Sequence, residues 1–167
     1  MTTSIFDLYD TDKGQWVDFG GGNRFKIRPS DSEIYLKDYE KRLKAIEKKV
    51  KEHTDFMNQH IVEEFDETTK TMVPNFKPDT TPEQATEVLR HKKDRENLIN
   101  KAFGESIIMS LVTDWELYGP DGVIEFNDEN KKKLLGPNFE PLRNKIWDEA
   151  KALSTEWNSR LKEMEKN

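Results

Sequence analysis

The most apolar stretch of the chain lies between residues 107 and 115 and is the best candidate for the centre of a core. Its large side chains recur at short intervals: Ile107, Ile108, Leu111, Val112 and Trp115. Elsewhere apolar material is sparse, because apolar residues make up 34% and charged residues 36% of the 167 residues, with a mean hydropathy of −0.94. A chain of this kind builds only a thin core. We therefore expect this stretch to lie at its centre.

The composition excludes several classes of protein. Four Trp, nine Phe and four Tyr, with a net charge of only −6, argue against an intrinsically disordered chain. The absence of cysteine excludes disulfide scaffolds, thiolate zinc sites and cysteine nucleophiles. No apolar run approaches the ~18 residues that span a bilayer, and the N-terminus lacks the pattern of a secretory signal. We expect a folded cytoplasmic protein with no membrane partner.

A β-hairpin is predicted over residues 15–29. Apolar and basic side chains alternate there with the period of a half-buried strand, in the order Arg24, Phe25, Lys26, Ile27 and Arg28. The preceding residues 20–23, three glycines and an asparagine, suit the turn, and Pro29 ends the strand. Residues 1–14, which carry three aspartates before Lys13, are expected to form a flexible arm.

From about Ser32 the apolar period becomes that of a helix. The residues on the apolar face are Tyr35, Tyr39, Leu43, Ile46 and Val50. The helix has three candidate caps, Ser30, Asp31 and Ser32. Asp38 and Arg42 are spaced to pair across one turn, and the pattern continues toward Phe65. Residues 66–81, with two prolines and many turn formers, are predicted to be a surface loop.

The second half of the chain also has helical signals. Thr81 and Gln84 are spaced as a capping box at the start of a helix that runs toward Ala102, and Gly104 is expected to interrupt it. Residues 115–126 predict a tight β-like bend. Asn127 is placed to cap a short helix that ends before Gly136, and a last helix begins at Asn138 or Phe139.

Taken together, these elements predict a mainly α fold. A helical domain over residues 30–167 would carry a small N-terminal β-hairpin and a short β-turn element near residues 115–126.

The sequence contains no recognisable catalytic or metal-binding motif. His53 and His60 lie two helical turns apart, too far to share an ion directly, and neither an HExxH nor an EF-hand pattern occurs. The three glycines at 20–22 are followed by a strand, whereas a phosphate-binding loop leads into a helix. We therefore expect no enzyme activity, no cofactor and no metal.

Nucleic-acid binding has one candidate segment, which is rich in lysine. The basic residues are Lys37, Lys41, Arg42, Lys44, Lys48, Lys49 and Lys51. Four acidic residues interleave with them, so a solvated helix face is the better interpretation, and the pI near 5.2 disfavours a phosphate-tracking surface. Nucleic acid is therefore an unlikely partner.

The last helix presents a long stripe of large apolar side chains, which are candidate partner-binding residues: Ile146, Leu153, Trp157, Leu161 and Met164. Such a stripe packs within the chain or against another chain; the first is the default. Trp16 and Phe25, beside the basic strand residues, are further candidates for a partner surface. Because the core is small, self-association into a homo-oligomer is a further way to bury apolar surface.

Two stretches resemble tail assembly chaperones of long-tailed bacteriophages. The first, Gly14-Gln15-Trp16-Val17-Asp18-Phe19 with Arg24-Phe25-Lys26-Ile27-Arg28, is similar to the short N-terminal hairpin of that family. The second, residues 111–135, looks like the family's apolar helix that ends in a Trp, followed by a DG turn, a short strand and a capped helix that reaches Leu134-Leu135. Residues 1–13 and 61–81 lie outside the resemblance.

The resemblance implies a mostly α-helical, non-enzymatic protein of the cytoplasm of the infected bacterial host. Such a protein coats the tape measure protein and helps to recruit tail-tube subunits. The alternative is a structural minor tail or neck component of the virion, and a small nucleic-acid-associated regulator is less favoured because of the acidic pI.

Overall fold

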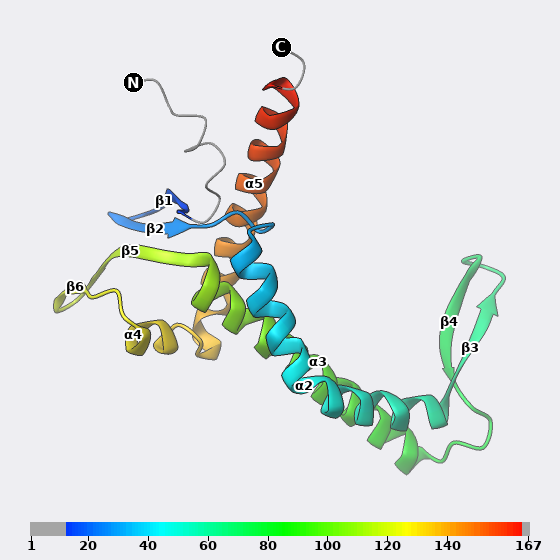
Figure 1. The fold of residues 1–167 in the computed structure, drawn as a ribbon. Coiled ribbons are helices and arrows are strands. Elements are labelled where there is room, and N and C mark those ends of the chain that lie inside the picture. The colour runs from blue at the N-terminus through cyan, green and yellow to red at the C-terminus, as the bar shows by residue number, and fades with distance from the viewer. Residues whose placement is uncertain (1–12, 165–167) are drawn as a thin grey trace. The chain divides into compact units, whose positions relative to one another are not determined.

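The structure is a computed structural model that describes residues 13–164, apart from the side chains of Leu161 and Met164. The first part of the chain forms β1 (Gln15–Gly20), β2 (Asn23–Ile27), α2 (Glu33–His60), β3 (Ile61–Asp66), β4 (Thr71–Phe76) and α3 (Pro82–Ser106). It continues with η1 (Ile107–Leu111), β5 (Val112–Gly119), β6 (Gly122–Ile124), α4 (Asp128–Lys133), η2 (Pro137–Phe139) and α5 (Glu140–Met164) (Figure 1). The arm expected over residues 1–14 lies outside the described residues, except for Lys13 and Gly14.

The expectation of a mainly α fold is wrong. Helices make up 60% and strands 23% of the structure, which contains a four-stranded antiparallel sheet and a separate two-stranded sheet. The fold is therefore mixed α and β. The error has three sources. Residues 112–115 were included in a helical stripe, and the helical pattern was expected to continue toward Phe65, although α2 ends at His60 and residues 61–66 form β3. Residues 66–81 were expected to be a loop, although β4 lies within them.

The described residues form two compact units. Unit 1 contains residues 13–42 and 103–164, and unit 2 contains residues 43–102. Both α2 and α3 contribute to each unit. The division falls inside the helical domain that was expected over residues 30–167.

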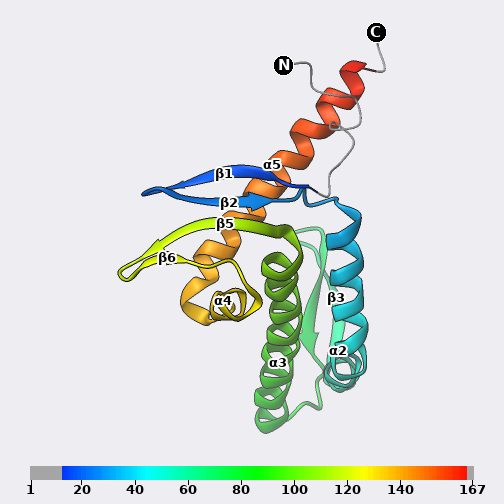
Figure 2. The same ribbon diagram turned by 60° about the vertical axis from the view of Figure 1, so that its left-hand side comes forward.

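The four-stranded sheet of unit 1 has the strand order β1-β2-β5-β6 (Figure 2). Residues 15–27 form its first hairpin, in which Val17 lies opposite Phe25. Phe25 in turn lies opposite Trp115 of β5. Because opposite residues point to the same side of a sheet, the apolar side chains of β1, β2 and β5 share one face. The charged residues Arg24 and Lys26 share the other.

The chain changes from helix to strand at Val112. Residues 107–111 form a π-helical turn, and Val112 then adopts an extended conformation, with φ −80° and ψ 116°. β2 supplies the hydrogen-bonding partner, since Ile27 pairs with Val112. A strand conformation depends on such a partner more than on local preference. The apolar spacing of residues 107–115 contains no information about β2, and it therefore favoured a helix throughout.

The core of unit 1 is centred on the apolar stretch that the sequence singled out. Residues 107, 108, 111, 112 and 115 are all buried, which confirms the expectation. They pack against two residues of the hairpin, Phe25 and Ile27, and against Tyr35 of α2 and Ile146 of α5.

Gly104 lies inside α3 and does not interrupt the helix, contrary to expectation. A Cβ atom at this position would lie 3.1 Å from Nε of Arg143. The guanidinium of Arg143 donates hydrogen bonds to the carbonyl oxygens of Leu134 (2.9 Å) and Gly136 (2.8 Å). The glycine therefore makes room for a side chain that ties α4 to α5.

A serine on α5 joins this helix to the turn between β2 and α2. The hydroxyl of Ser154 donates to the carboxylate of Asp31 and lies 2.9 Å from the hydroxyl of Ser30. The backbone N–H of Ser30 donates to the carbonyl of Ala150 at 3.0 Å. Ser154 is buried, so these bonds form in a site shielded from water, where each is worth more than on the surface.

In unit 2, α2 and α3 are joined by the β3–β4 hairpin. The predicted capping box of α3 is confirmed, because the Thr81 N–H donates to Gln84 (2.8 Å) and the Gln84 N–H donates to Thr81 (3.3 Å). Lys77 caps the other helix: its ammonium donates to the carbonyl of Gln59 at 2.8 Å and its backbone N–H to that of His60 at 2.9 Å. Carbonyls that lack a partner at the end of α2 are thereby satisfied.

The helices carry mainly charged residues on their exposed sides. The predicted pair between Asp38 and Arg42 is confirmed at 2.8 Å, and Arg42 also contacts Glu105 of α3 at 2.6 Å. Lys37 pairs with Glu33 one turn earlier. None of the helices within residues 13–164 combines the length and the apolar character needed to cross a lipid bilayer.

Candidate functional site

An apolar groove of about 600 Å³ lies in unit 1, between the four-stranded sheet and the segment that leads from α4 into α5. The sheet contributes Phe19, Phe25, Trp115, Leu117 and Ile124. The facing segment contributes Leu134, Phe139, Pro141 and Leu142. This volume and this apolar lining are typical of sites that receive a ligand or the side chains of a partner.

The strand register explains why the apolar side chains meet in this groove. Leu117 lies opposite Ile124. Leu117 is also on the same face of the sheet as Trp115, because one residue separates Leu117 from Trp115 along β5. The other face of the sheet carries charges: Arg24 makes a two-pronged ion pair with Glu116, with nitrogen–oxygen distances of 2.9 and 2.7 Å. One face of the sheet is thus charged and the other forms the wall of the groove.

The indole ring of Trp115 holds the sheet wall in place. Its Nε1–H donates to the carbonyl of Ile124 at 2.8 Å. The ring packs edge-on against Phe126, at 4.9 Å between centroids, and against Phe25, at 6.1 Å. Edge-to-face pairs of this kind have a preferred geometry. The groove wall is therefore built from mutually oriented rings.

The facing wall depends on a helix cap that the sequence predicts correctly. The side chain of Asn127 accepts a hydrogen bond from the N–H of Asn130 at 2.9 Å and so begins α4. Arg143 holds the carbonyls of Leu134 and Gly136, as described above, which fixes the turn between α4 and α5. Leu134 precedes this turn and Leu142 follows it, and both line the groove.

The polar groups at the groove are mainly basic or neutral. The ammonium of Lys145 lies 4.5 Å from the centre of the Phe19 ring, and no carboxylate among residues 13–164 pairs with it. Lys133 contacts Glu129 at 3.2 Å and Asn130 at 2.9 Å. An occupant that combines apolar side chains with a carboxylate would therefore match the groove in both polarity and charge.

A buried lysine lies behind the facing wall. The ammonium of Lys131 donates to the carbonyl of Val112 at 3.0 Å and lies 4.6 Å from the centre of the Phe126 ring. Burial lowers the pKa of Lys131, because the charged form is poorly solvated. Its contacts link α4 to the start of β5, which indicates a structural role.

The structure distributes the predicted partner-binding residues over several environments. Phe25 and Ile146 have exposed fractions of 1% and 0% and belong to the core, although Phe25 also lines the groove. Trp16 is exposed on the charged face of the sheet, where the Arg24 guanidinium lies 5.2 Å from its ring centre. Of the α5 stripe, Leu153 and Trp157 are half-buried. The side chains of Leu161 and Met164 lie outside the description.

Sequence analysis missed most of the groove residues. Phe19, Leu117 and Ile124 alternate with polar residues in the same way as the strand that was recognised, and this period-two signal could have found them. Phe139 and Leu142 carry no such signal, because they come from a turn and the beginning of a helix.

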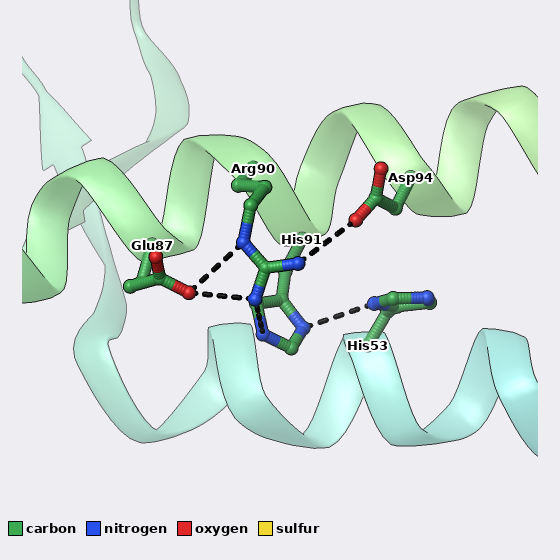
Figure 3. Close-up of polar contacts among 5 residues, drawn as sticks. All are labelled: His53, Glu87, Arg90, His91 and Asp94. Atoms are coloured by element: carbon green, nitrogen blue, oxygen red, sulfur yellow. Dashed lines mark hydrogen bonds and ion pairs between the residues drawn. The ribbon is translucent and has the colours of Figure 1, made fainter.

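Unit 2 contains a pair of histidines, His53 and His91, that sequence analysis did not bring together. Nδ1 of His53 on α2 lies 2.9 Å from Nδ1 of His91 on α3 (Figure 3). Phe56 stacks on the His91 ring, with 4.0 Å between the ring centres. Arg90 lies 3.4 Å from Nε2 of His91. Since a guanidinium only donates, Nε2 accepts, and the proton of neutral His91 is on Nδ1 and donates to His53.

The surroundings of His91 oppose a positive charge on its ring. Burial, Arg90 and His53 lower the pKa of His91, in that order of importance. Arg90 is itself held by Glu87 at 2.6 Å and Asp94 at 3.3 Å. Within residues 13–164, no three His, Asp or Glu side chains are grouped so as to hold a metal ion. The pair is thus best described as a hydrogen bond between two helices.

Comparison with known proteins leaves the groove as the main guide to function. No protein-family model matches the chain, and neither a curated protein nor a solved structure matches it significantly.

Proposed function

We propose that this protein is a non-enzymatic tail assembly chaperone of a long-tailed bacteriophage, and that its groove binds the tape measure protein. The observation that carries the proposal is the open apolar groove with Lys145 at its edge. The resemblance of residues 14–28 and of the turn, short strand and capped helix over residues 121–135 to that family supports the choice of partner. The segment before them does not add support, because Val112–Gly119 forms the strand β5 and not the helix that the resemblance implies. The protein would act in the cytoplasm of the infected host.

The groove suits an amphipathic helix. Such a helix places apolar side chains three and four residues apart on one face, and these would enter between Leu117 of the sheet and Leu142 of α5. A Glu or Asp beside them would reach the Lys145 ammonium. A tape measure protein is long and helical, so it offers many segments of this kind.

The charged exterior supports the same proposal. A chaperone must keep an aggregation-prone partner in solution, and a surface with many charges of both signs serves this end. Charged residues make up 36% of the chain. Recruitment of tail-tube subunits, the second part of the proposed role, would then use surfaces other than the occupied groove.

Co-expression tests the proposal. The full chain is produced together with a tape measure protein of a long-tailed phage, and the soluble fraction of the tape measure protein is measured. We expect the wild-type chain to keep this protein soluble and to co-purify with it. If the tape measure protein stays insoluble with the wild-type chain, the proposal is wrong.

Two neighbouring residues of β6 provide a matched pair of variants. Ile124 lines the groove, whereas Val123 points to the other face of the sheet and is more exposed. Ile124→Ser should abolish co-purification and Val123→Ser should preserve it. Equal behaviour of the two variants would show that the groove is not the binding site.

Mass spectrometry of purified virions separates this proposal from its alternative. An assembly chaperone is expected to be absent from the finished particle. Presence in stoichiometric amounts would favour a structural minor tail or neck component.

A further inference from the structure

The β3–β4 hairpin of unit 2 has one apolar and one polar face. The register pairs Ile61 with Phe76, Glu63 with Pro74, and Phe65 with Met72, as the strands leave the end of α2 (Figure 1). Since alternate residues of a strand point to the same side, these six side chains share a face. Five of the six are apolar.

This apolar face is open to solvent. Phe65 and Met72 have exposed fractions of 57% and 55%, and Phe76 is exposed as well. The opposite face contains polar contacts, such as the hydrogen bond from the Asn75 amide to Glu64 at 3.0 Å. A two-stranded ribbon has little stability of its own, so three large exposed side chains on one of its faces are more than the fold requires.

A carboxylate lies in the middle of the apolar face. Glu63 is exposed, and no hydrogen bond or ion pair to it is found among residues 13–164. The hairpin as a whole is acidic, because residues 61–76 contain four acidic side chains and a single lysine. The surface therefore combines apolar area with negative charge.

We propose that this apolar face is a second docking surface, which binds an amphipathic helical segment that carries Lys or Arg among its apolar side chains. The basic group would pair with Glu63, and the apolar groups would cover Phe65 and Met72. The identity of the bound protein as the tape measure protein rests on the proposed function. The charge preference is opposite to that of the groove, where Lys145 favours an acidic segment.

A second copy of this chain fits the face less well. In a two-fold interface identical residues meet only near the axis. Glu63 lies in the middle of the apolar face, so an axis through the centre of this face would bring the Glu63 carboxylates of the two copies together, where their like charges repel. Addition of a strand at the edge is also hindered, because Pro74 has no N–H to donate on β4.

Two designed helical peptides of about 20 residues test the inference. Both have the same leucine stripe; one carries lysines beside it and the other carries glutamates. Binding to the full chain is measured by fluorescence anisotropy at about 0.15 M salt, where long-range attraction is largely screened. We expect the lysine peptide to bind the hairpin and the glutamate peptide to bind the groove.

Matched variants locate each binding event. Two variants should each weaken the binding of the lysine peptide by about tenfold or more, as the loss of central contacts does. They are the double variant Phe65→Ser with Met72→Ser, and the single variant Glu63→Lys. Two controls should stay near the wild-type value. Leu89→Ser removes an apolar side chain of unit 2 with a comparable exposed fraction, 59%, and Glu67→Lys makes the same charge change in the hairpin turn.

The outcomes distinguish the two proposals. The inference is wrong if the hairpin variants bind the lysine peptide as tightly as the wild type does. It is also wrong if Glu67→Lys lowers the affinity for this peptide as much as Glu63→Lys does. Self-association of the wild-type chain that the double variant abolishes would also overturn it, in favour of a second copy. Failure of the glutamate peptide to bind, or its insensitivity to Ile124→Ser, counts against the groove alone.

Discussion

The indole N–H of Trp115 donates a hydrogen bond to the carbonyl oxygen of Ile124 across 2.8 Å. This contact adds to the antiparallel pairing of β5 with the short strand β6 and lies at the wall of the groove. A core residue and a residue of the proposed binding site are therefore directly linked. Effects on stability and on binding can therefore be separated only with variants that change one of these two properties and leave the other unchanged.

Trp115→Ala should lower the free energy of unfolding by ~3–5 kcal/mol, the usual range for removal of a large buried aromatic side chain. The ring is buried against Phe25 and Phe126. Trp115→Phe keeps most of the apolar area and loses the hydrogen bond, so its effect should be smaller. Chemical denaturation measures both values. Wild-type stability of the alanine variant would show that this core is placed incorrectly.

Ser154→Ala should lower the free energy of unfolding by about 1–3 kcal/mol, because the buried hydroxyl contacts both Asp31 and Ser30. Ser159→Ala is the matched control on the same helix. The hydroxyls of Ser154 and Ser159 each bond the carbonyl four residues earlier, on Ala150 and Thr155. The hydroxyl of Ser159 is exposed, however, and has no hydrogen-bond partner on another element within residues 13–164. Thermal denaturation of the two variants compares them. Similar melting temperatures would contradict a role of Ser154 in holding α5.

Gly104→Ala should be destabilising by about 1 kcal/mol or more, although alanine has the higher helix propensity. The new methyl group would lie 3.1 Å from Nε of Arg143, whose guanidinium is held at two carbonyls. In the background Arg143→Ala the same change should become stabilising. This double-mutant cycle is measured by denaturation. Additive effects would exclude the steric explanation.

The histidine pair should make stability depend on pH. The folded chain holds the pKa of His91 below its ordinary value of 6.5. Above pH 6.5 the ring is neutral in both the folded and the unfolded chain, and its contribution to stability is complete. As the pH falls below 6.5 the unfolded chain takes up the proton first, so stability decreases until the pH reaches the folded pKa.

Denaturation between about pH 7.5 and pH 5.5 tests this dependence, which lies in the range where histidine titrates. We expect the wild-type chain to lose more stability over this range than His91→Gln does. His60→Gln serves as a control, since His60 lies outside the pair. If wild type and His91→Gln show the same slope, burial of His91 beside Arg90 and His53 does not lower its pKa in the folded chain.

Local signals predicted several elements correctly. The alternation of Phe25 and Ile27 with basic residues indicated the strand β2, because its two faces meet different environments. Asn127, and Thr81 with Gln84, marked the helix starts at which their side chains are found to accept or donate hydrogen bonds. These signals succeed because each depends on atoms within a few residues of the same chain.

The candidate site was predicted less well. Sequence analysis selected Phe25 and Ile146 for partner binding, since large apolar side chains on a regular face suit both a core and an interface. The structure buries both. Phe25 still lines the groove, together with side chains from strands and a turn that are distant in sequence, such as Phe19 and Phe139. The proximity of these residues has no sequence signal.

By itself, the sequence determined where helices start, how the first hairpin alternates and which stretch is buried most deeply. Only the tertiary structure decided that Val112 begins a strand, that Gly104 stays within a helix and that His53 meets His91. The physical reason is the same in each case. The strand at Val112 depends on its pairing with β2, Gly104 is required by the side chain of Arg143 that packs against it, and each histidine depends on a partner from the other helix. None of these neighbours is close in the chain.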